Sequence, residues 1–255
     1  MLCCIAPFPG FESPLVSKYA CLIRHAQNDR TTLEMRMKIY WFKAQAPRRV
    51  LALAKHLGVD AEFIEVDMMA GGLRAPDYAE LNPNMKAPTL VDGDRVLWES
   101  SAIMAYLCTK KESDMWPAHS PTDQVEVVRW LSWNDCHWAP AVAPFYFEYI
   151  VKGTFGIGPP DLELLKSSVA NLIKYAKVLD GHLSGRHYIA CDRLTVADFQ
   201  LASMATDWRE SDMPLKEFPH IVRWLDGLLR IPAWSDPWPQ SSPCFPGAQN
   251  ALTIS

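Results

Sequence analysis

The stretch NPNMKAPTLVDGDRVLWESS, residues 82–101, decides the fold of this chain. Residues 89–91 and 95–98 are short runs of high β propensity, and Gly93 lies between them. This pattern predicts a β-hairpin, because glycine accepts the positive φ that a tight turn requires. Pro88 stands at the start of the first run, one of the few positions where a strand tolerates proline.

The same stretch predicts a site for a small peptide. Residues 99–101, Glu-Ser-Ser, precede an apolar pattern that indicates a helix start, and the free N–H groups of a helix N-terminus suit a carboxylate. Glu99 would add a counter-charge for an ammonium group. If the Ala87–Pro88 peptide bond is cis, the backbone of Ala87 can pair with an extended ligand. The alternative is a plain hairpin followed by a capped helix.

The order strand, helix, strand, hairpin and Glu-Ser-Ser resembles the glutathione-binding domain of the cytosolic glutathione transferase superfamily. Residues 194–199, LTVADF, resemble the capping-box and staple motif of that superfamily's helical domain, with Thr195 as N-cap and Asp198 three residues later. The resemblance runs from about Met37 to about Trp238. It leaves the class within the superfamily open, and a bacterial type is one of the alternatives. It implies an α/β N-terminal thioredoxin-like domain followed by an all-α helical-bundle domain.

The sequence divides into five segments. Residues 1–36 have no sustained periodicity, and we expect a disordered extension or an upstream start. The thioredoxin-like domain is predicted at residues 37–112 and the linker at residues 113–120. The all-helical domain is predicted at residues 121–238, and residues 239–255 are expected to form a loose tail because they have little periodicity.

Bulk properties narrow the function classes. A net charge of −4 gives no electrostatic argument for nucleic acid. No run approaches the roughly 18 apolar residues of a membrane span. The seven cysteines are scattered and have neither a disulfide framework nor zinc spacing. We therefore expect a cytoplasmic protein with reduced thiols, no metal, no nucleic-acid partner and no membrane partner.

The residues expected to activate a thiol are unusual. In many members of the superfamily, a Tyr, Ser or Cys near the first strand or the first helix contacts the glutathione sulfur. Here the corresponding residues are Ala44, Gln45 and Ala46, which carry no hydroxyl or thiol. We expect the backbone N–H of Ala46 and the side chain of Gln45 to stabilise the thiolate. Three other donors stay open: Lys43, Tyr40 and Trp41.

The resemblance also implies which residues bind glutathione. Lys86, Ala87 and Pro88 match the positions that bracket the cysteinyl backbone. Glu99 and Ser100 match the pair that holds the γ-glutamyl end. Glutathione is thus the expected co-substrate.

A cluster in the helical half is a candidate for the electrophile pocket. Trp130, Trp133, Asn134 and His137 stand at positions i, i+3, i+4 and i+7, so they share one face of a helix. We expect them to line a pocket for an apolar substrate, with a core position as the alternative for the tryptophans.

The sequence therefore predicts a transferase that joins the glutathione thiol to a small hydrophobic electrophile. A glutathione-binding or protein-interaction module with weak turnover is the alternative, and a glutathione-dependent isomerase is a third. The resemblance also implies a homodimer.

Overall fold

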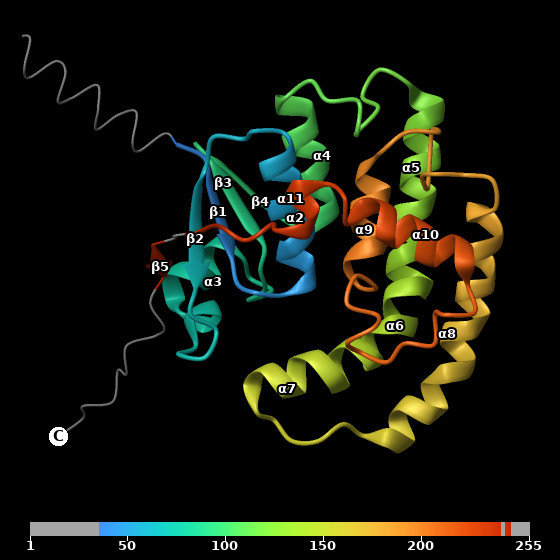
Figure 1. The fold of residues 1–255 in the computed structure, drawn as a ribbon. Helices are drawn as coiled ribbons and strands as arrows, with labels where there is room; N and C mark the ends of the chain where they lie inside the picture. The colour runs from blue at the N-terminus through green and yellow to red at the C-terminus, as the bar shows by residue number, and fades with distance from the viewer. Residues whose placement is uncertain (1–35, 241–242, 246–255) are drawn as a thin grey trace, which may run out of the picture.

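The computed structural model describes residues 36–240 and 243–245, so the predicted N-terminal extension lies almost wholly outside the described residues (Figure 1). The first domain is built on a mixed sheet in the order β4-β3-β1-β2-β5. Strands β1 and β2 pair in parallel, and β3 and β4 form the predicted antiparallel hairpin beside β1. The first four strands are β1 (Lys38–Trp41), β2 (Glu62–Val66), β3 (Thr89–Asp92) and β4 (Arg95–Trp98).

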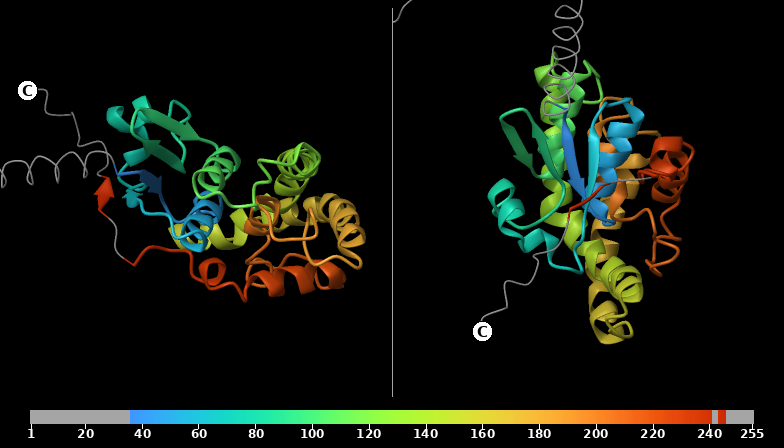
Figure 2. Two further views of the ribbon diagram at one scale, coloured as in Figure 1. Left: turned by 90° about the horizontal axis from the view of Figure 1, so that it is seen from above. Right: turned by 90° about the vertical axis from the view of Figure 1, so that its left-hand side faces the viewer.

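The first helix of this domain turns an apolar face to the core. The apolar stripe Val50, Leu53 and Ala54 is buried in the core, and Gly58, with φ +58°, follows the end of its helix in the left-handed conformation that glycine favours. Two helices, α2 and α4, lie between the sheet and the helical domain (Figure 2). The helical segments are α2 (Gln45–His56), η1 (Gly72–Arg74), α3 (Pro76–Leu81) and α4 (Ser100–Lys110).

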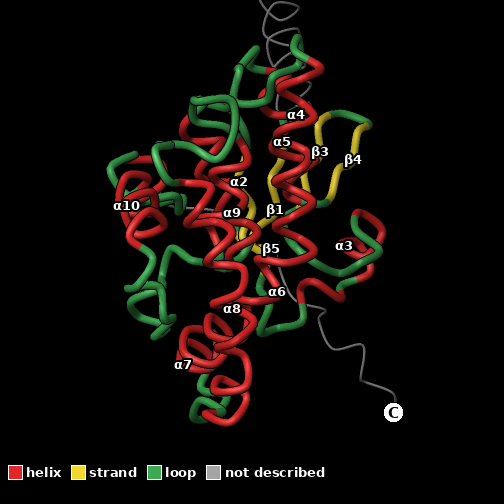
Figure 3. The backbone as a smooth tube through the Cα atoms, turned by 90° about the vertical axis from the view of Figure 1, so that its right-hand side faces the viewer, coloured by secondary structure: helices red, strands yellow, loops and turns green. Residues whose placement is uncertain are grey.

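The second domain is all helical. A nearly continuous helical run contains two π-helical turns; it comprises α5 (Pro121–Trp133), η2 (Asn134–Trp138), α6 (Ala139–Phe145), η3 (Tyr146–Val151) and α7 (Lys152–Phe155). The later helices are α8 (Leu162–Leu183), α9 (Val196–Ser203), α10 (Pro219–Leu228) and α11 (Pro232–Ser235). The tube in Figure 3 shows the helices of this domain, in which α5 packs against α9. Within the described part of the chain, none of these helices combines the length and apolar character needed to span a membrane.

The predicted capping box at the start of α9 is present and is tied into the tertiary structure. The Asp198 carboxylate is fully buried and accepts hydrogen bonds from the backbone N–H of Thr195 at 2.8 Å and of Ile189 at 2.9 Å. It also accepts one from the indole N–H of Trp224 on α10 at 3.0 Å. One carboxylate therefore caps α9 and joins it to two other segments of the domain.

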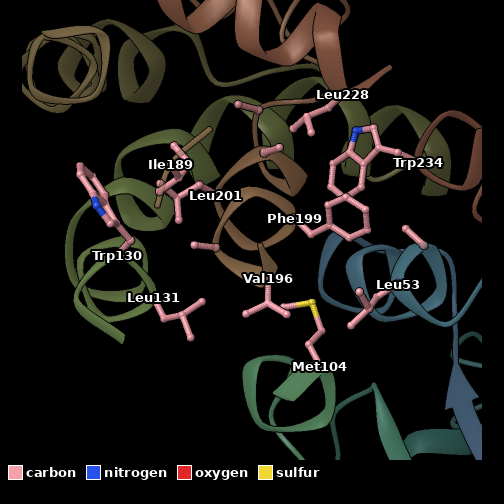
Figure 4. Packing of buried hydrophobic residues seen from close by; sticks show 14 of the residues in the cluster. Leu53, Met104, Trp130, Leu131, Ile189, Val196, Phe199, Leu201, Leu228 and Trp234 are labelled. Carbon is pink, nitrogen blue, oxygen red and sulfur yellow. The ribbon is translucent and has the colours of Figure 1, made fainter. Parts of the chain in front are cut away.

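The hydrophobic core is continuous between the two domains. Figure 4 shows Leu53 of α2 and Met104 of α4 beside Val196 and Phe199 of α9, and all four side chains are fully buried. The ring of Phe199 also lies 4.6 Å from that of Trp234 in α11. This packing fixes α9 against the first domain and so sets the width of the space between the domains.

The prediction of a loose tail at residues 239–255 is wrong at residues 244–245, and residues 246–255 lie outside the described part of the chain. Strand β5 (Cys244–Phe245) pairs in parallel with β2, with Cys244 opposite Glu65, and extends the sheet at its edge. The ring of Phe245 packs edge-on against Tyr40 and Tyr78 on the far face of the sheet. Strand pairing satisfies the exposed edge of β2, and the two aromatic contacts bury the end of the added strand.

Candidate active site

A cleft of about 690 Å³ lies between the two domains. The first domain contributes the residues that follow β1, the start of α2 and the loop after β2. The helical domain contributes η3, α7 and the segment after α9. The lining residues with polar or aromatic side chains near the start of α2 are Phe42, Lys43, Gln45, Arg48, Tyr146, Asp207 and Trp238.

The N-terminus of α2 opens into this cleft. Ala44 is extended, with φ −155° and ψ 168°, and no side chain caps the helix. The first intrahelical bond runs from the Arg48 N–H to the Ala44 carbonyl at 2.9 Å. The N–H groups of Gln45 and Ala46 precede that bond, and Pro47 has none to offer. Two backbone donors and the positive end of the helix dipole are thus available to an anion.

The side chain of Gln45 is tied to the opposite domain. Its Nε2 donates to the Asp207 carboxylate at 2.7 Å, and its Oε1 has no partner among the described residues. Burial raises the pKa of Asp207, while the Arg48 guanidinium and the Gln45 hydrogen bond oppose the rise. Burial and the Asp207 charge also raise the pKa of the neighbouring Tyr146 hydroxyl. Sequence reasoning missed Asp207, because it lies 162 residues from Gln45 and has no local motif.

Arg48 anchors the same wall of the cleft. Its guanidinium donates to the Trp234 carbonyl at 2.7 Å and lies 5.3 Å from the ring centre of Trp234. Burial lowers the pKa of Arg48, and the nearby charge of Asp207 opposes this shift. Arg48 therefore places a positive charge near the Asp207 carboxylate.

The two predicted glutathione-binding segments meet at one end of the sheet. Tyr40 on β1 lies opposite Thr89 on β3, and Thr89 lies opposite Trp98 on β4. The residues that precede Thr89 and those that follow Trp98 therefore leave the sheet at the end where β1 leads into α2. The structure thus brings together Lys86, Ala87, Pro88, Glu99, Ser100, Gln45 and Ala46 around this end of the sheet.

The Lys86–Pro88 segment presents free backbone. The Lys86 carbonyl accepts hydrogen bonds from the Tyr78 hydroxyl at 2.8 Å and from Asn82 Nδ2 at 2.7 Å. The Ala87–Pro88 bond is cis. Neither the N–H nor the carbonyl of Ala87 joins a backbone hydrogen bond of the described turns and loops. Ala87 can therefore pair with an extended peptide ligand.

Glu99 has an unusual backbone conformation. Its φ of +68° and ψ of 118° are costly for a residue with a Cβ atom. The Glu99 side chain is exposed, whereas Ser100, the first residue of α4, is buried. Burial lowers the pKa of Arg49 to about 10, and the charges of Asp135 and Glu99 oppose this shift. A strained residue beside free N–H groups is typical of a ligand site.

Two of the alternative sulfur donors lie outside the cleft. Tyr40 is buried on the far face of the sheet, and its ring lies 5.8 Å from that of Tyr78. Trp41 is buried against Trp238, with stacked rings 5.8 Å apart. Lys43 lines the cleft, and its Nζ lies 5.9 Å from the centre of the Trp238 ring.

The predicted electrophile cluster is not part of the cleft. Trp130 packs against His182, with ring centres 4.3 Å apart, and His137 stacks on Tyr175 at 5.0 Å. These contacts are made with α8. Trp133 also packs on Tyr175, and Asn134 is fully buried in the helical domain. The helical spacing was correct, but this face packs on α8, and the cleft is lined by the helical turns that follow it.

The fold and the cleft define a two-domain protein that combines a thioredoxin-like domain, with the predicted ligand-binding segments at one end of its sheet, and a helical domain. The family described as "Glutathione S-transferase, N-terminal domain" matches residues 35–109, and "Glutathione S-transferase, C-terminal domain" matches residues 132–232. The chain belongs to the glutathione S-transferase family.

Individual relatives agree with this assignment. Glutathione S-transferase 3 of Zea mays is 33% identical over 73% of this chain and 85% of its own length. The theta-class enzyme of Xanthomonas axonopodis pv. citri, solved with glutathione bound, is 27% identical, with a TM-score of 0.70 over 85% of this chain and 99% of its own. Glutathione transferase F7 of Populus trichocarpa is 25% identical, with a TM-score of 0.72 over 78% of this chain and 96% of its own.

Proposed function

We propose that the protein binds glutathione and transfers its thiol to a hydrophobic electrophile held in the interdomain cleft. One observation carries the proposal: the free N–H groups of α2, the unpaired backbone of Ala87 and the strained Glu99 lie at the same end of the sheet. These groups suit a thiolate, an extended peptide backbone and an ammonium group, the three features of glutathione.

In this proposal the backbone N–H groups of Gln45 and Ala46 stabilise the thiolate. A free thiol has a pKa of about 8.5, and a helix N-terminus lowers it. The thiol releases its proton to solvent, the sulfur forms a bond to the electrophilic carbon, and the leaving group departs with the bonding electron pair. The second N–H of the Gln45 amide adds a donor, with the side chain oriented by Asp207.

We also propose roles for the predicted binding residues. Ala87 pairs with the cysteinyl backbone, between the well-anchored Lys86 carbonyl and Pro88. Glu99 holds the γ-glutamyl ammonium group, and the start of α4 at Ser100 holds the adjacent carboxylate. The apolar part of the cleft then holds the electrophile.

A binding module with weak turnover is the second candidate. It is favoured by Ala44 and Ala46, because the segment carries neither a hydroxyl nor a thiol that could contact the sulfur. Retention on glutathione-agarose and conjugation of chlorodinitrobenzene separate the candidates. Retention with turnover supports the transferase, retention without turnover across several electrophiles supports the module, and failure to bind glutathione contradicts both.

We further propose a cytoplasmic homodimer. Exposed apolar side chains occur on β4 and on α5, where Val96, Trp98, Val125 and Val128 are solvent-accessible in the single chain. Such residues support an interface with a second copy. Light scattering of the purified protein tests the dimer, and replacing Val125 with Glu should shift it toward monomer.

A further inference from the structure

A C-terminal segment closes one side of the cleft. We define the C-terminal strap as residues 231–240, which follow α10 and lie almost wholly beyond the matched C-terminal family domain. Figure 2 shows the chain passing along one side of both domains toward β5. The strap therefore adds a wall that the two family domains do not themselves supply.

The strap is fixed to α2 at two points. Arg48 donates to the Trp234 carbonyl at 2.7 Å, and Lys55 pairs with the Asp236 carboxylate at 3.2 Å. Farther along the chain, β5 is paired with β2 at the sheet edge. The residues between these attachments are thus held against the first domain.

Trp238 lies between the attachments and faces the cleft. Its ring stacks on Trp41 at 5.8 Å with an angle of 28° between the planes. Lys43 Nζ and Arg48 Cζ each lie 5.9 Å from the centre of the Trp238 ring. The indole is half-buried and lines the same cavity as Gln45. Its plane is therefore set before a substrate arrives.

We propose that Trp238 is a specificity-determining residue that selects planar aromatic electrophiles by ring contact. The proposal rests on the proposed transfer reaction and names the substrate class for the same cleft. An aromatic substrate would contact the exposed part of the indole, whereas a small aliphatic substrate would gain little from it. Because the ring is already fixed, little conformational entropy is lost when a substrate binds to it. The ring contact therefore favours aromatic substrates.

The test compares two electrophiles in the full-length protein. Chlorodinitrobenzene is the aromatic probe, and iodoacetamide is the small aliphatic probe. The variants are Trp238→Leu, Trp238→Phe and the control Trp116→Leu, which alters a partly buried tryptophan in the linker outside the cleft. Calorimetry with glutathione and thermal unfolding are measured for each variant.

We expect Trp238→Leu to raise KM for chlorodinitrobenzene by about three- to tenfold, the range of one aromatic contact, with the KM for iodoacetamide unchanged. Trp238→Phe should recover most of the wild-type ratio of the two KM values. Trp116→Leu should behave like the wild type. An unchanged ratio of the two KM values in Trp238→Leu, or an equal shift in Trp116→Leu, overturns the proposal. A wild-type protein that does not bind glutathione, or that binds it without turnover, instead contradicts the proposed function.

A labelling experiment tests the proposal even if Trp238→Leu does not fold. A glutathione conjugate that carries an aryl azide is bound to the wild-type protein, photolysed and mapped by peptide mass spectrometry. The proposal predicts label within residues 231–240. Label absent from this segment but present elsewhere in the cleft overturns it.

Discussion

Gln45 and Asp207 connect the two domains across the cleft, with Gln45 Nε2 donating to Asp207 Oδ2 at 2.7 Å. Gln45 belongs to the first turn of α2, and Asp207 follows α9. The bond fixes the Gln45 side chain, proposed to contact the thiolate, to the domain proposed to hold the electrophile. One polar contact therefore ties the start of α2 to the helical domain across the cleft.

Replacing Gln45 with Leu tests that contact. Loss of a hydrogen bond to a carboxylate should lower the free energy of unfolding by about 1–3 kcal/mol. The control Gln124→Leu removes an exposed hydrogen bond to the Ala118 carbonyl and should cost about 0.5 kcal/mol or less. Urea unfolding measures both, and equal losses would contradict a special role for the interdomain bond.

The pH dependence of stability should change in Asp207→Asn. Burial raises the pKa of Asp207 in the folded protein. The carboxyl thus binds its proton more tightly when folded, and its stabilising contribution is lost as the pH rises above about 3.9 and through the folded pKa. The unfolding free energy of Asp207→Asn should therefore rise relative to that of the wild type as the pH increases from about 4 through the folded pKa of Asp207. A constant difference over this range would rule out the shift.

Replacing Glu99 with glycine should have opposite effects on stability and on glutathione binding. Glycine accepts positive φ, so Glu99→Gly should leave the unfolding free energy unchanged or raise it by up to about 1 kcal/mol. Loss of the carboxylate should weaken glutathione binding by about tenfold or more. Glu112→Gly, at another residue with positive φ (+50°) beyond the end of α4, is the matched control and should keep the wild-type affinity. Calorimetry that finds equal affinities for the two variants would remove Glu99 from the site.

His137→Ala distinguishes the two locations considered for the electrophile. The His137 ring stacks on Tyr175 in the helical domain and does not line the cleft. We expect kcat/KM for chlorodinitrobenzene to stay within about twofold of the wild type, since substitutions away from a site have small effects. A rise in KM of tenfold or so, without a change in thermal stability, would return the electrophile to the helical cluster.

The buried cap of α9 should be essential for folding. Asp198→Ala leaves the N–H groups of Thr195 and Ile189 and the indole of Trp224 without their acceptor. The expected loss is about 3 kcal/mol or more. Asp161→Ala removes the exposed N-cap of α8 and should cost only about 1 kcal/mol. Similar losses in both variants would show that the buried network adds nothing to the cap.

Features encoded over a few residues could be predicted from the sequence. The turn at Gly93, the stop at Gly58 and the cap between Thr195 and Asp198 depend on backbone conformation and hydrogen bonds within short segments. The order of these elements also placed the two segments predicted to bind glutathione at the same end of the sheet. Local chemistry and the order of the elements were sufficient to predict these features. Paired strands place the segments that flank them at defined ends of the sheet.

Tertiary structure decided what lies in the cleft. The spacing of Trp130 and His137 identified a common helix face, but only packing showed that this face meets α8. Asp207 and Trp238 reach the site from segments far from α2 in the chain, and β5 joins the sheet after the matched domains end. Periodicity shows that a face is apolar without showing which neighbour covers it. That choice depends on long-range packing, which no local pattern contains.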